Sequence, residues 1–119
     1  MNSRDDVAKF MYACDQNAKD FGPQANLYMG LVIEEYKELV VAFGNRDMVE
    51  IADACADLKW VIEGLEHTLG IPQQAVWDEV ARSNLAKIST SGKVEKREDG
   101  KVLKPEGWTP PDIKSILKK

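Results

Sequence analysis

The chain is poor in the residues that build zinc and redox sites. Its 119 residues include one histidine, His67, and two cysteines, Cys14 and Cys55. A di-iron carboxylate bundle needs Glu-x-x-His twice, and Gly64 stands three residues before His67, so that class is excluded. We interpret His67 as a surface residue near a helix end. Both cysteines lie in helical patterns with apolar neighbours, which predicts small core residues in a reducing compartment.

Long apolar runs are also missing. No segment approaches the roughly 18 apolar residues that a membrane span requires. Residues 1–6 are too acidic and too polar for a signal peptide. Hydrophobic residues make up 44% of the chain, which is an ordinary share for a globular protein. We therefore expect one cytoplasmic domain over residues 1–119 that does not associate with membranes.

Charge is divided unevenly along the chain. Residues 1–81 contain 15 acids and 6 Lys or Arg, whereas residues 82–119 contain 5 acids and 10 Lys or Arg, so the two parts carry −9 and +5. We expect an acidic helical body over 1–90 and a basic tail over 91–119. This division suits an anionic ligand held through a cation, although a merely solvated tail gives the same pattern. Nucleic acid is not an expected partner, because Trp108 is the tail's only aromatic residue and the net charge is negative.

Apolar residues recur at helical spacing in four segments, which predicts an all-α four-helix bundle. The segments are 3–21, about 25–43, 48–69 and 72 to about 88. Their boundaries are marked by Ser3-x-x-Asp6, Gly22-Pro23, Gly44-Asn45, Asp47 with Glu50 at the capping-box position, Gly70 and Pro72. In the tail, 93–97 and 101–104 are expected to form a small hairpin around Asp99-Gly100, followed by a short helix from Asp112.

Six acids on two neighbouring predicted helices carry the chemical information: Glu34, Glu35, Glu38, Glu50, Asp53 and Asp57. The first three fall within an arc of about 100° and the last three within about 60°. No basic residue lies four positions beyond any of them. Because the second predicted helix is apolar nearly all round, we expect its acids to be partly shielded from water. Antiparallel packing would join the two groups around a cation, and carboxylates without His or Cys favour Mg²⁺ or Mn²⁺.

Some of these acids also have structural explanations. Glu50 can complete a capping box with Asp47, Glu34 can pair with Lys37 on the surface, and Asp57 can act as an outer partner of the metal ligands. The acids without such explanations are Glu35, Glu38 and Asp53. The rival hypothesis is a non-catalytic helical interaction protein whose acids form a solvated face, and it predicts no affinity for Mg²⁺.

The spacing of these acids resembles a known signature. Glu34-Glu35-Tyr36-Lys37-Glu38 followed by Glu50-Ile51-Ala52-Asp53 gives EExxE…ExxD. This pattern is similar to that of the MazG-like all-α NTP pyrophosphatase superfamily, which includes MazG proteins, dimeric dUTPases and phosphoribosyl-ATP pyrophosphohydrolases. The segments from Asp53 to Gly64, from Arg82 to Lys87, from Asp99 to Lys104 and from Trp108 to Asp112 resemble short single-domain MazG-like proteins. The resemblance covers roughly residues 27–113.

The resemblance implies roles for individual residues. Mg²⁺ ligands would be Glu35, Glu38, Glu50 and Asp53. Glu34 would bridge the metal or help to activate water, so the catalytic acids would be Glu34, Glu35 and Glu38. Asn84, Lys87 and Lys104 would face the nucleotide or its phosphates. Gly30 departs from the pattern, because relatives often have a basic residue there, and we interpret this glycine as a site of close backbone packing.

The implied reaction is hydrolysis of an NTP or dNTP to the monophosphate and pyrophosphate. Water activated with the help of the metal would attack the α-phosphorus, and a carboxylate would take its proton. The task would be cleaning or adjusting the nucleotide pool. Apolar residues surround most of each predicted helix, so we also expect a homodimer or a dimer of dimers.

Overall fold

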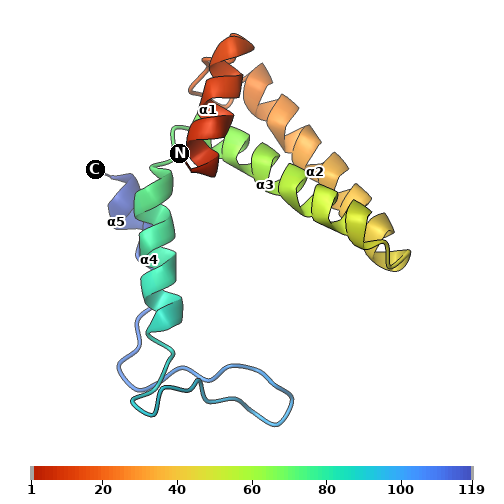
Figure 1. Ribbon diagram of the computed structural model, residues 1–119. Helices are drawn as coiled ribbons and strands as arrows, with labels where there is room; N and C mark the ends of the chain where they lie inside the picture. The colour runs from red at the N-terminus through yellow and green to blue at the C-terminus, as the bar shows by residue number, and fades with distance from the viewer. Residues whose placement is uncertain (1, 119) are drawn as a thin grey trace. The chain divides into compact units, whose positions relative to one another are not determined.

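The computed structural model describes residues 2–118 and divides into two compact units, Met1–Ile71 and Pro72–Lys119. The first unit contains α1 (Ser3–Ala13), α2 (Pro23–Gly44) and α3 (Met48–Thr68), and the second contains α4 (Gln73–Leu85) and α5 (Ile113–Leu117) (Figure 1). Within residues 2–118 there is no β-strand, only two isolated bridges. The predicted all-α class is therefore confirmed. The described helices include none that is long and apolar enough to cross a membrane.

The first unit is built on an antiparallel pair formed by α2 and α3 (Figure 1). The core consists of Val7 and Met11 from α1, Tyr28 from α2 and Val61 from α3. A Cβ atom placed on Gly64 of α3 would overlap the ring of Tyr28, so α3 needs a glycine at this position for α2 to pack against it. The tyrosine hydroxyl donates a hydrogen bond of 2.6 Å to Gln16, which lies in the loop between α1 and α2.

Asp47 begins α3 as the sequence predicts. Its side chain accepts a 3.2 Å hydrogen bond from the backbone N–H of Glu50. The preceding helix starts two residues earlier than expected, with Gly22 as its cap and Pro23 in its first turn, because proline there removes only an N–H that has no helical partner. Together Gly22 with Pro23 and Asp47 set where the two helices that carry the acids begin.

The first helix is shorter than expected. Asn2, not Ser3, is its N-cap, and the helix ends at Ala13, well before Gly22. Asp15 takes a φ of 58°, a left-handed conformation that turns the chain out of the helix. The interpretation of Cys14 as a core residue is therefore wrong: it caps the helix end and is exposed, while Cys55 on α3 is half-buried.

Within the single chain, Gly30 is not the close-packing site that the sequence suggests. A Cβ atom added there would meet no other atom within 4 Å. The residue is exposed on α2, so the single chain gives no packing reason for a glycine at this position. Helical spacing alone could not show which turn of the helix would face a neighbour.

The second unit joins α4 to the basic tail. The fourth helix ends at Leu85, and Ile88, its predicted end, instead forms an antiparallel bridge with Val94. A second bridge joins Lys96 to Val102 across the turn at Gly100, whose φ is 89°. The expected hairpin around Asp99-Gly100 is thus present as a single isolated bridge. Asp112 caps α5 as predicted, and its side chain accepts a hydrogen bond from the backbone of Ser115.

Polar contacts hold the tail against α4. The carboxylate of Glu79 accepts a 2.7 Å hydrogen bond from the backbone N–H of Asp112, and Arg82 donates a 3.2 Å bond to the carbonyl of Pro110. Glu79 and Arg82 also form an ion pair of 2.8 Å. The pKa of Glu79 falls to about 2, mainly through its hydrogen bond with Arg82 and then through that with Asp112. The fourth helix, which the sequence predicts as part of the acidic body, therefore packs with the tail. That the whole chain forms a single domain stays a prediction.

Replacing Gly64 should destabilise the fold by crowding the two helices. Gly64→Ala places a methyl group in the Tyr28 ring, and overpacking of this kind costs about 1–3 kcal/mol. Gly30→Ala is the matched control, since it adds a methyl group in open space and should stabilise the helix by about 0.5–1 kcal/mol. Urea unfolding of both variants at one protein concentration measures the difference. Equal stability of Gly64→Ala and the wild type would contradict the close packing.

Candidate active site

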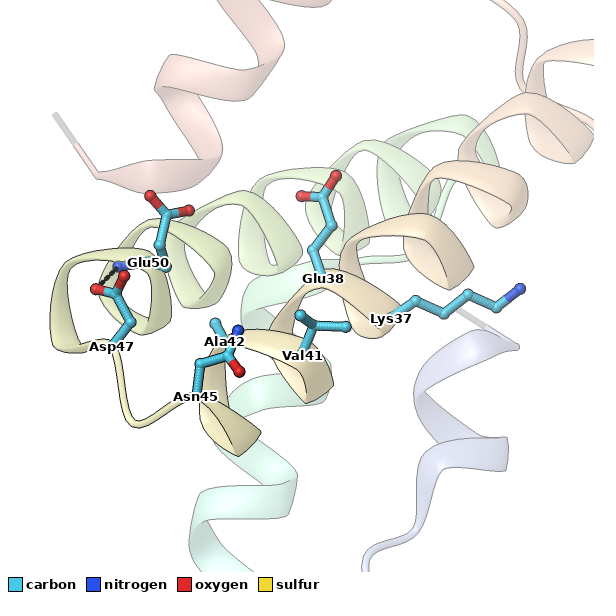
Figure 2. Close-up of a pocket in the computed structure, with 7 residues that line it drawn as sticks. All are labelled: Lys37, Glu38, Val41, Ala42, Asn45, Asp47 and Glu50. Carbon is cyan, nitrogen blue, oxygen red and sulfur yellow. Dashed lines mark hydrogen bonds between the residues drawn. The ribbon is translucent and has the colours of Figure 1, made fainter.

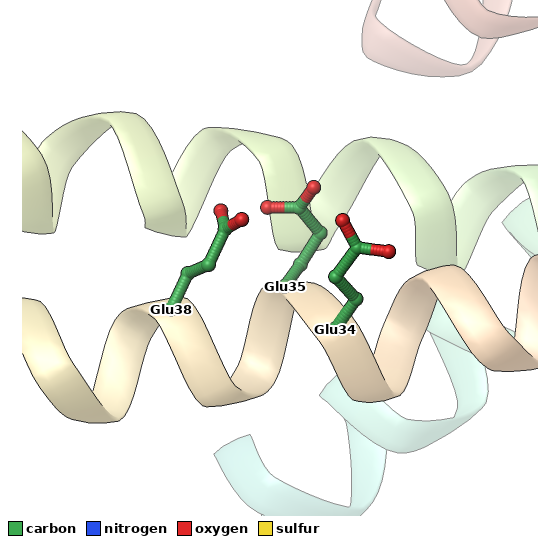
Figure 3. Close-up of side chains that lie close together, drawn as sticks. All are labelled: Glu34, Glu35 and Glu38. Carbon is green, nitrogen blue, oxygen red and sulfur yellow. The ribbon is translucent and has the colours of Figure 1, made fainter.

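Three carboxylates of α2 gather on one side of the helix. Glu34, Glu35 and Glu38 each offer an oxygen that lies within 4.8 Å of the others, and Figure 3 shows the three side chains extending toward α3. Positions i, i+1 and i+4 share a face because each residue turns the helix by about 100°. The predicted arc on the second helix is therefore present.

The third helix adds two carboxylates to this group. Asp57 is close enough to Glu35 and Glu38 for its charge to interact with theirs, and it also interacts with Asp53 on its own helix. As expected, the antiparallel pairing of α2 and α3 brings the acids of the two helices close together. Asp57, which we had assigned to an outer role, therefore lies within the electrostatic reach of both helices' acids.

Crowding makes two of these groups harder to ionise. The pKa of Glu35 rises to about 7, first because burial disfavours its charged form, then because of a hydrogen bond with Glu38 and the charges of Glu38, Asp57 and Glu34. Burial also raises the pKa of Asp57, with further contributions from Asp53 and Glu38. Two carboxylates about 5 Å apart repel by roughly 3 kcal/mol at an effective dielectric constant of 20. Without a bound cation, this repulsion between the carboxylates is not offset.

The surroundings of one Glu35 oxygen indicate whether a cation would fit the site. Its Oε2 is buried and has no hydrogen-bond partner. No acid of the group forms an ion pair within residues 2–118, and Glu34 is not paired with Lys37. A buried carboxylate oxygen without a partner is costly, and a divalent ion with a preference for hard oxygen ligands would satisfy it. The donor set therefore fits Mg²⁺.

A cavity of about 520 Å³ lies beside the acids, at the end of the helix pair where α2 turns into α3 (Figure 2). It is lined by Lys37, Glu38, Val41, Ala42, Asn45, Asp47 and Glu50. Figure 2 shows the carboxylates of Glu38 and Glu50 on one side of the helix pair, while Lys37 extends away from them. The structure thus brings Glu50 to the same cavity as Glu38, although not into the tight group with Glu34 and Glu35.

Shielding of the acids is less complete than expected. Glu35 and Asp57 are half-buried, whereas Glu34, Glu38, Glu50 and Asp53 are exposed. In the first unit α2 packs mainly against α3, which leaves its remaining face uncovered in the single chain. The expectation of shielded acids on α2 therefore holds for Glu35 and is wrong for its two neighbours.

The three residues assigned to the nucleotide belong to the second unit and lie together there. The ammonium of Lys87 donates a 3.0 Å hydrogen bond to the side-chain oxygen of Asn84. The ammonium nitrogens of Lys87 and Lys104 lie 5.4 and 4.8 Å from the centre of the Trp108 ring. From the sequence alone, Trp108 stands out only as the tail's sole aromatic residue. The sequence feature that could have indicated its contact with Lys104 is its position, directly after Gly107 and four residues after Lys104.

The sequence of the chain matches a known protein family. Residues 3–84 match the family model described as phosphoribosyl-ATP pyrophosphohydrolase, a span that contains every acid of the cluster and ends at Asn84. No curated protein matches the sequence. The family is part of the superfamily that the acid spacing resembles, so that resemblance is confirmed. The chain belongs to the phosphoribosyl-ATP pyrophosphohydrolase family, within the MazG-like all-α NTP pyrophosphatase superfamily.

Proposed function

We propose that the protein is a Mg²⁺-dependent nucleoside triphosphate pyrophosphohydrolase that converts an NTP or dNTP to the monophosphate and pyrophosphate. Family membership supports a nucleotide pyrophosphohydrolase in general. The metal is supported by one observation above all, the buried and unpartnered Oε2 of Glu35 within a group of carboxylates. A solvated acidic face, as in a non-catalytic interaction protein, has no reason to bury such an oxygen.

Four carboxylates would hold the metal: Glu35, Glu38, Glu50 and Asp53. Mn²⁺ has the same preference for oxygen ligands and would fit the same residues. When bound, the metal would lower the pKa of water and neutralise charge on the phosphates. Asp57, which is hydrogen-bonded to Asp53, would orient that ligand, as outer partners of metal ligands commonly do.

The remaining acid and the basic residues would carry out the other steps. Glu34 is exposed beside Glu35, where it would take the proton of the attacking water. The water oxygen would form a bond to the α-phosphorus as the bond to the bridging oxygen breaks, and pyrophosphate would leave. Lys87 and Lys104 would neutralise phosphate oxygens, and the amide of Asn84 would contact the nucleotide.

Phosphoribosyl-ATP is a second candidate substrate, favoured by the name of the matching family. Hydrolysis of its triphosphate at the same bond would also release pyrophosphate, so the two candidates differ in the base that is recognised. We propose a nucleotide-pool role in the cytoplasm for the first candidate.

We also propose that the protein is a homodimer or a dimer of dimers. In the single chain, α2 leaves many large apolar side chains exposed: Leu27, Met29, Ile33, Tyr36, Val40, Val41 and Phe43. Monomeric proteins rarely expose a continuous apolar surface of this extent, and a second copy would cover it.

A substrate panel tests the proposed reaction. Incubation with Mg²⁺ and each common or modified NTP, dNTP and phosphoribosyl-ATP should give the corresponding monophosphate and pyrophosphate in equal amounts from the preferred substrate. Chromatography of the nucleotide and a pyrophosphate assay measure both products. Orthophosphate from every triphosphate, or no product from any of them, would refute the proposal.

Metal binding should stabilise the fold, because it removes the repulsion between the carboxylates. At a Mg²⁺ concentration of 100 times Kd, the free energy of unfolding should increase by about 2.7 kcal/mol and the Tm should rise accordingly.

In Glu38→Gln and Asp53→Asn this rise in Tm with Mg²⁺ should be lost, and kcat/KM should fall about 100-fold or more. The helical spectrum should be unchanged, and the Tm without metal should be equal to or higher than that of the wild type. Glu98→Gln, an exposed acid in the tail, is the control and should behave like wild type. A Tm and a nucleotide affinity that do not respond to Mg²⁺ would exclude the metal site.

The two lysines should contribute to nucleotide binding and not to metal binding. Lys87→Ala and Lys104→Ala should each cost about 1.5–3 kcal/mol of nucleotide affinity, the range for a hydrogen bond to a charged group, with Mg²⁺ affinity nearly intact. Lys93→Ala removes an exposed tail lysine and is the matched control. Calorimetric titration with a non-hydrolysable NTP analogue measures the change. Equal losses in Lys93→Ala and Lys104→Ala would mean that the tail acts only through its overall charge.

Sedimentation should give a mass of at least two 13.3 kDa chains at micromolar concentration. Ile33→Glu places a charge on the exposed apolar face of α2 and should weaken the association, whereas Phe21→Glu changes an exposed residue in the preceding loop and should not. A wild-type protein that sediments as a single chain would contradict the proposed assembly.

A further inference from the structure

We propose that Trp108 is a positioning residue: its indole ring holds the ammonium groups of Lys87 and Lys104 in place for phosphate while leaving both charges uncompensated. Both nitrogens lie at cation–π distance from one ring, at 5.4 and 4.8 Å from its centre. The inference rests on the assignment of these lysines to phosphate in the proposed function, and adds the residue through which they are ordered.

The ring that contacts the lysines is itself fixed in place. Trp108 is half-buried, and its indole N–H donates a 2.6 Å hydrogen bond to the backbone carbonyl of Ser83, a buried residue of α4. A turn closes just before it, with a 3.1 Å hydrogen bond from the backbone N–H of Trp108 to the carbonyl of Pro105 and a φ of 80° at Gly107. The indole therefore has a single orientation relative to α4, the helix that carries Asn84.

The lysines depend on this ring because no carboxylate holds them. Neither ammonium forms an ion pair with any acid in the described part of the chain, although Glu95 and Glu106 line the 200 Å³ pocket that also includes Lys87. A carboxylate partner would neutralise an ammonium and compete with a phosphate for its N–H groups. An aromatic face attracts the cation through its quadrupole and carries no net charge, so the lysine keeps its full charge for an anion.

Contact with one ring also limits the distance between the two cations. Their nitrogens are separated by no more than the sum of their two distances from the ring centre. Lys87 is held further by its 3.0 Å hydrogen bond to Asn84. Long lysine side chains lose considerable rotamer freedom when they bind a ligand, and a site that has already restricted them binds with less loss of entropy. Trp108 would therefore act on affinity and KM through the two lysines, without touching the phosphates itself.

Binding of inorganic tripolyphosphate to the full-length protein, measured by calorimetry, tests this role without requiring turnover. Trp108→Leu should raise the Kd about 5- to 10-fold in the wild-type background, in line with the loss of cation–π contacts. In a Lys87→Ala/Lys104→Ala background the same change should alter the Kd less than about 2-fold, because Trp108 acts only through the lysines. Trp77→Phe, which removes an exposed indole from α4, is the control and should bind like wild type.

Site-specific fluorinated tryptophans at Trp108 keep the shape of the ring and its N–H donor, so they remain informative if Trp108→Leu does not fold. The Kd should rise stepwise with each added fluorine, since fluorine withdraws charge from the ring face. The Lys ε-methylene proton signals of both residues should lose their ring-current shift in Trp108→Leu. Equal effects of Trp108→Leu in the two backgrounds, or a flat fluorine series, would overturn the proposal.

The outcomes also separate this inference from the proposed function. If Lys87→Ala/Lys104→Ala binds tripolyphosphate as tightly as wild type, the assignment of the lysines fails and the role of Trp108 fails with it. If the lysine changes weaken binding and the Trp108 changes do not, only the role of Trp108 is overturned. Absence of NTP hydrolysis, with all the tripolyphosphate results as expected, would refute the proposed reaction and leave the binding role of Trp108 supported.

Discussion

The close antiparallel packing of α2 against α3 is the constraint on which the candidate site depends. It is made by a glycine on one helix and an aromatic ring on the other, Gly64 and Tyr28, because no side chain larger than hydrogen fits beside the ring. The same pairing carries the carboxylates of the two helices to within electrostatic reach. Packing energy from the core therefore holds together acids that repel one another, and a bound cation would relieve this repulsion.

Burial divides the acids into groups with different chemical properties. Glu35 and Asp57, half-buried between the helices, both have raised pKa values, and Glu35, with a pKa of about 7, would lose its proton when a divalent ion binds. The exposed Glu34 and Glu38 remain accessible to water and substrate. In the second unit Lys87 and Lys104 are organised in the opposite way, around a neutral ring instead of a charged partner. Neither these two lysines nor the acids of the candidate site have an ion-pair partner in the described part of the chain.

Local signals in the sequence predicted much of this structure. The Asp47 cap, the Asp112 cap and the turn at Gly100 all depend on residues within a few positions of one another, so they could be identified without knowing the fold. The arc formed by Glu34, Glu35 and Glu38 follows from helical geometry alone. The spacing EExxE…ExxD then connected these acids to the family that the comparison supports.

Features that depend on contacts distant in sequence could not be predicted. Cys14 was assigned to the core because its spacing is helical, but α1 ends one residue before it. Which of the acids would be buried is decided by the neighbour that covers each turn of α2, and spacing does not contain this information. Trp108 was missed as the residue joining Lys87 and Lys104 because the tail's return to α4 depends on backbone hydrogen bonds such as that to Ser83.

The central claim is that water attacks the α-phosphorus of a nucleoside triphosphate held by these acids. Hydrolysis in ¹⁸O-labelled water, followed by mass spectrometry of both products, tests it most directly. The account predicts one ¹⁸O atom in the nucleoside monophosphate and none in the pyrophosphate. Label in the pyrophosphate would show attack at the β-phosphorus, and labelled orthophosphate would show attack at the γ-phosphorus; either result would contradict the account.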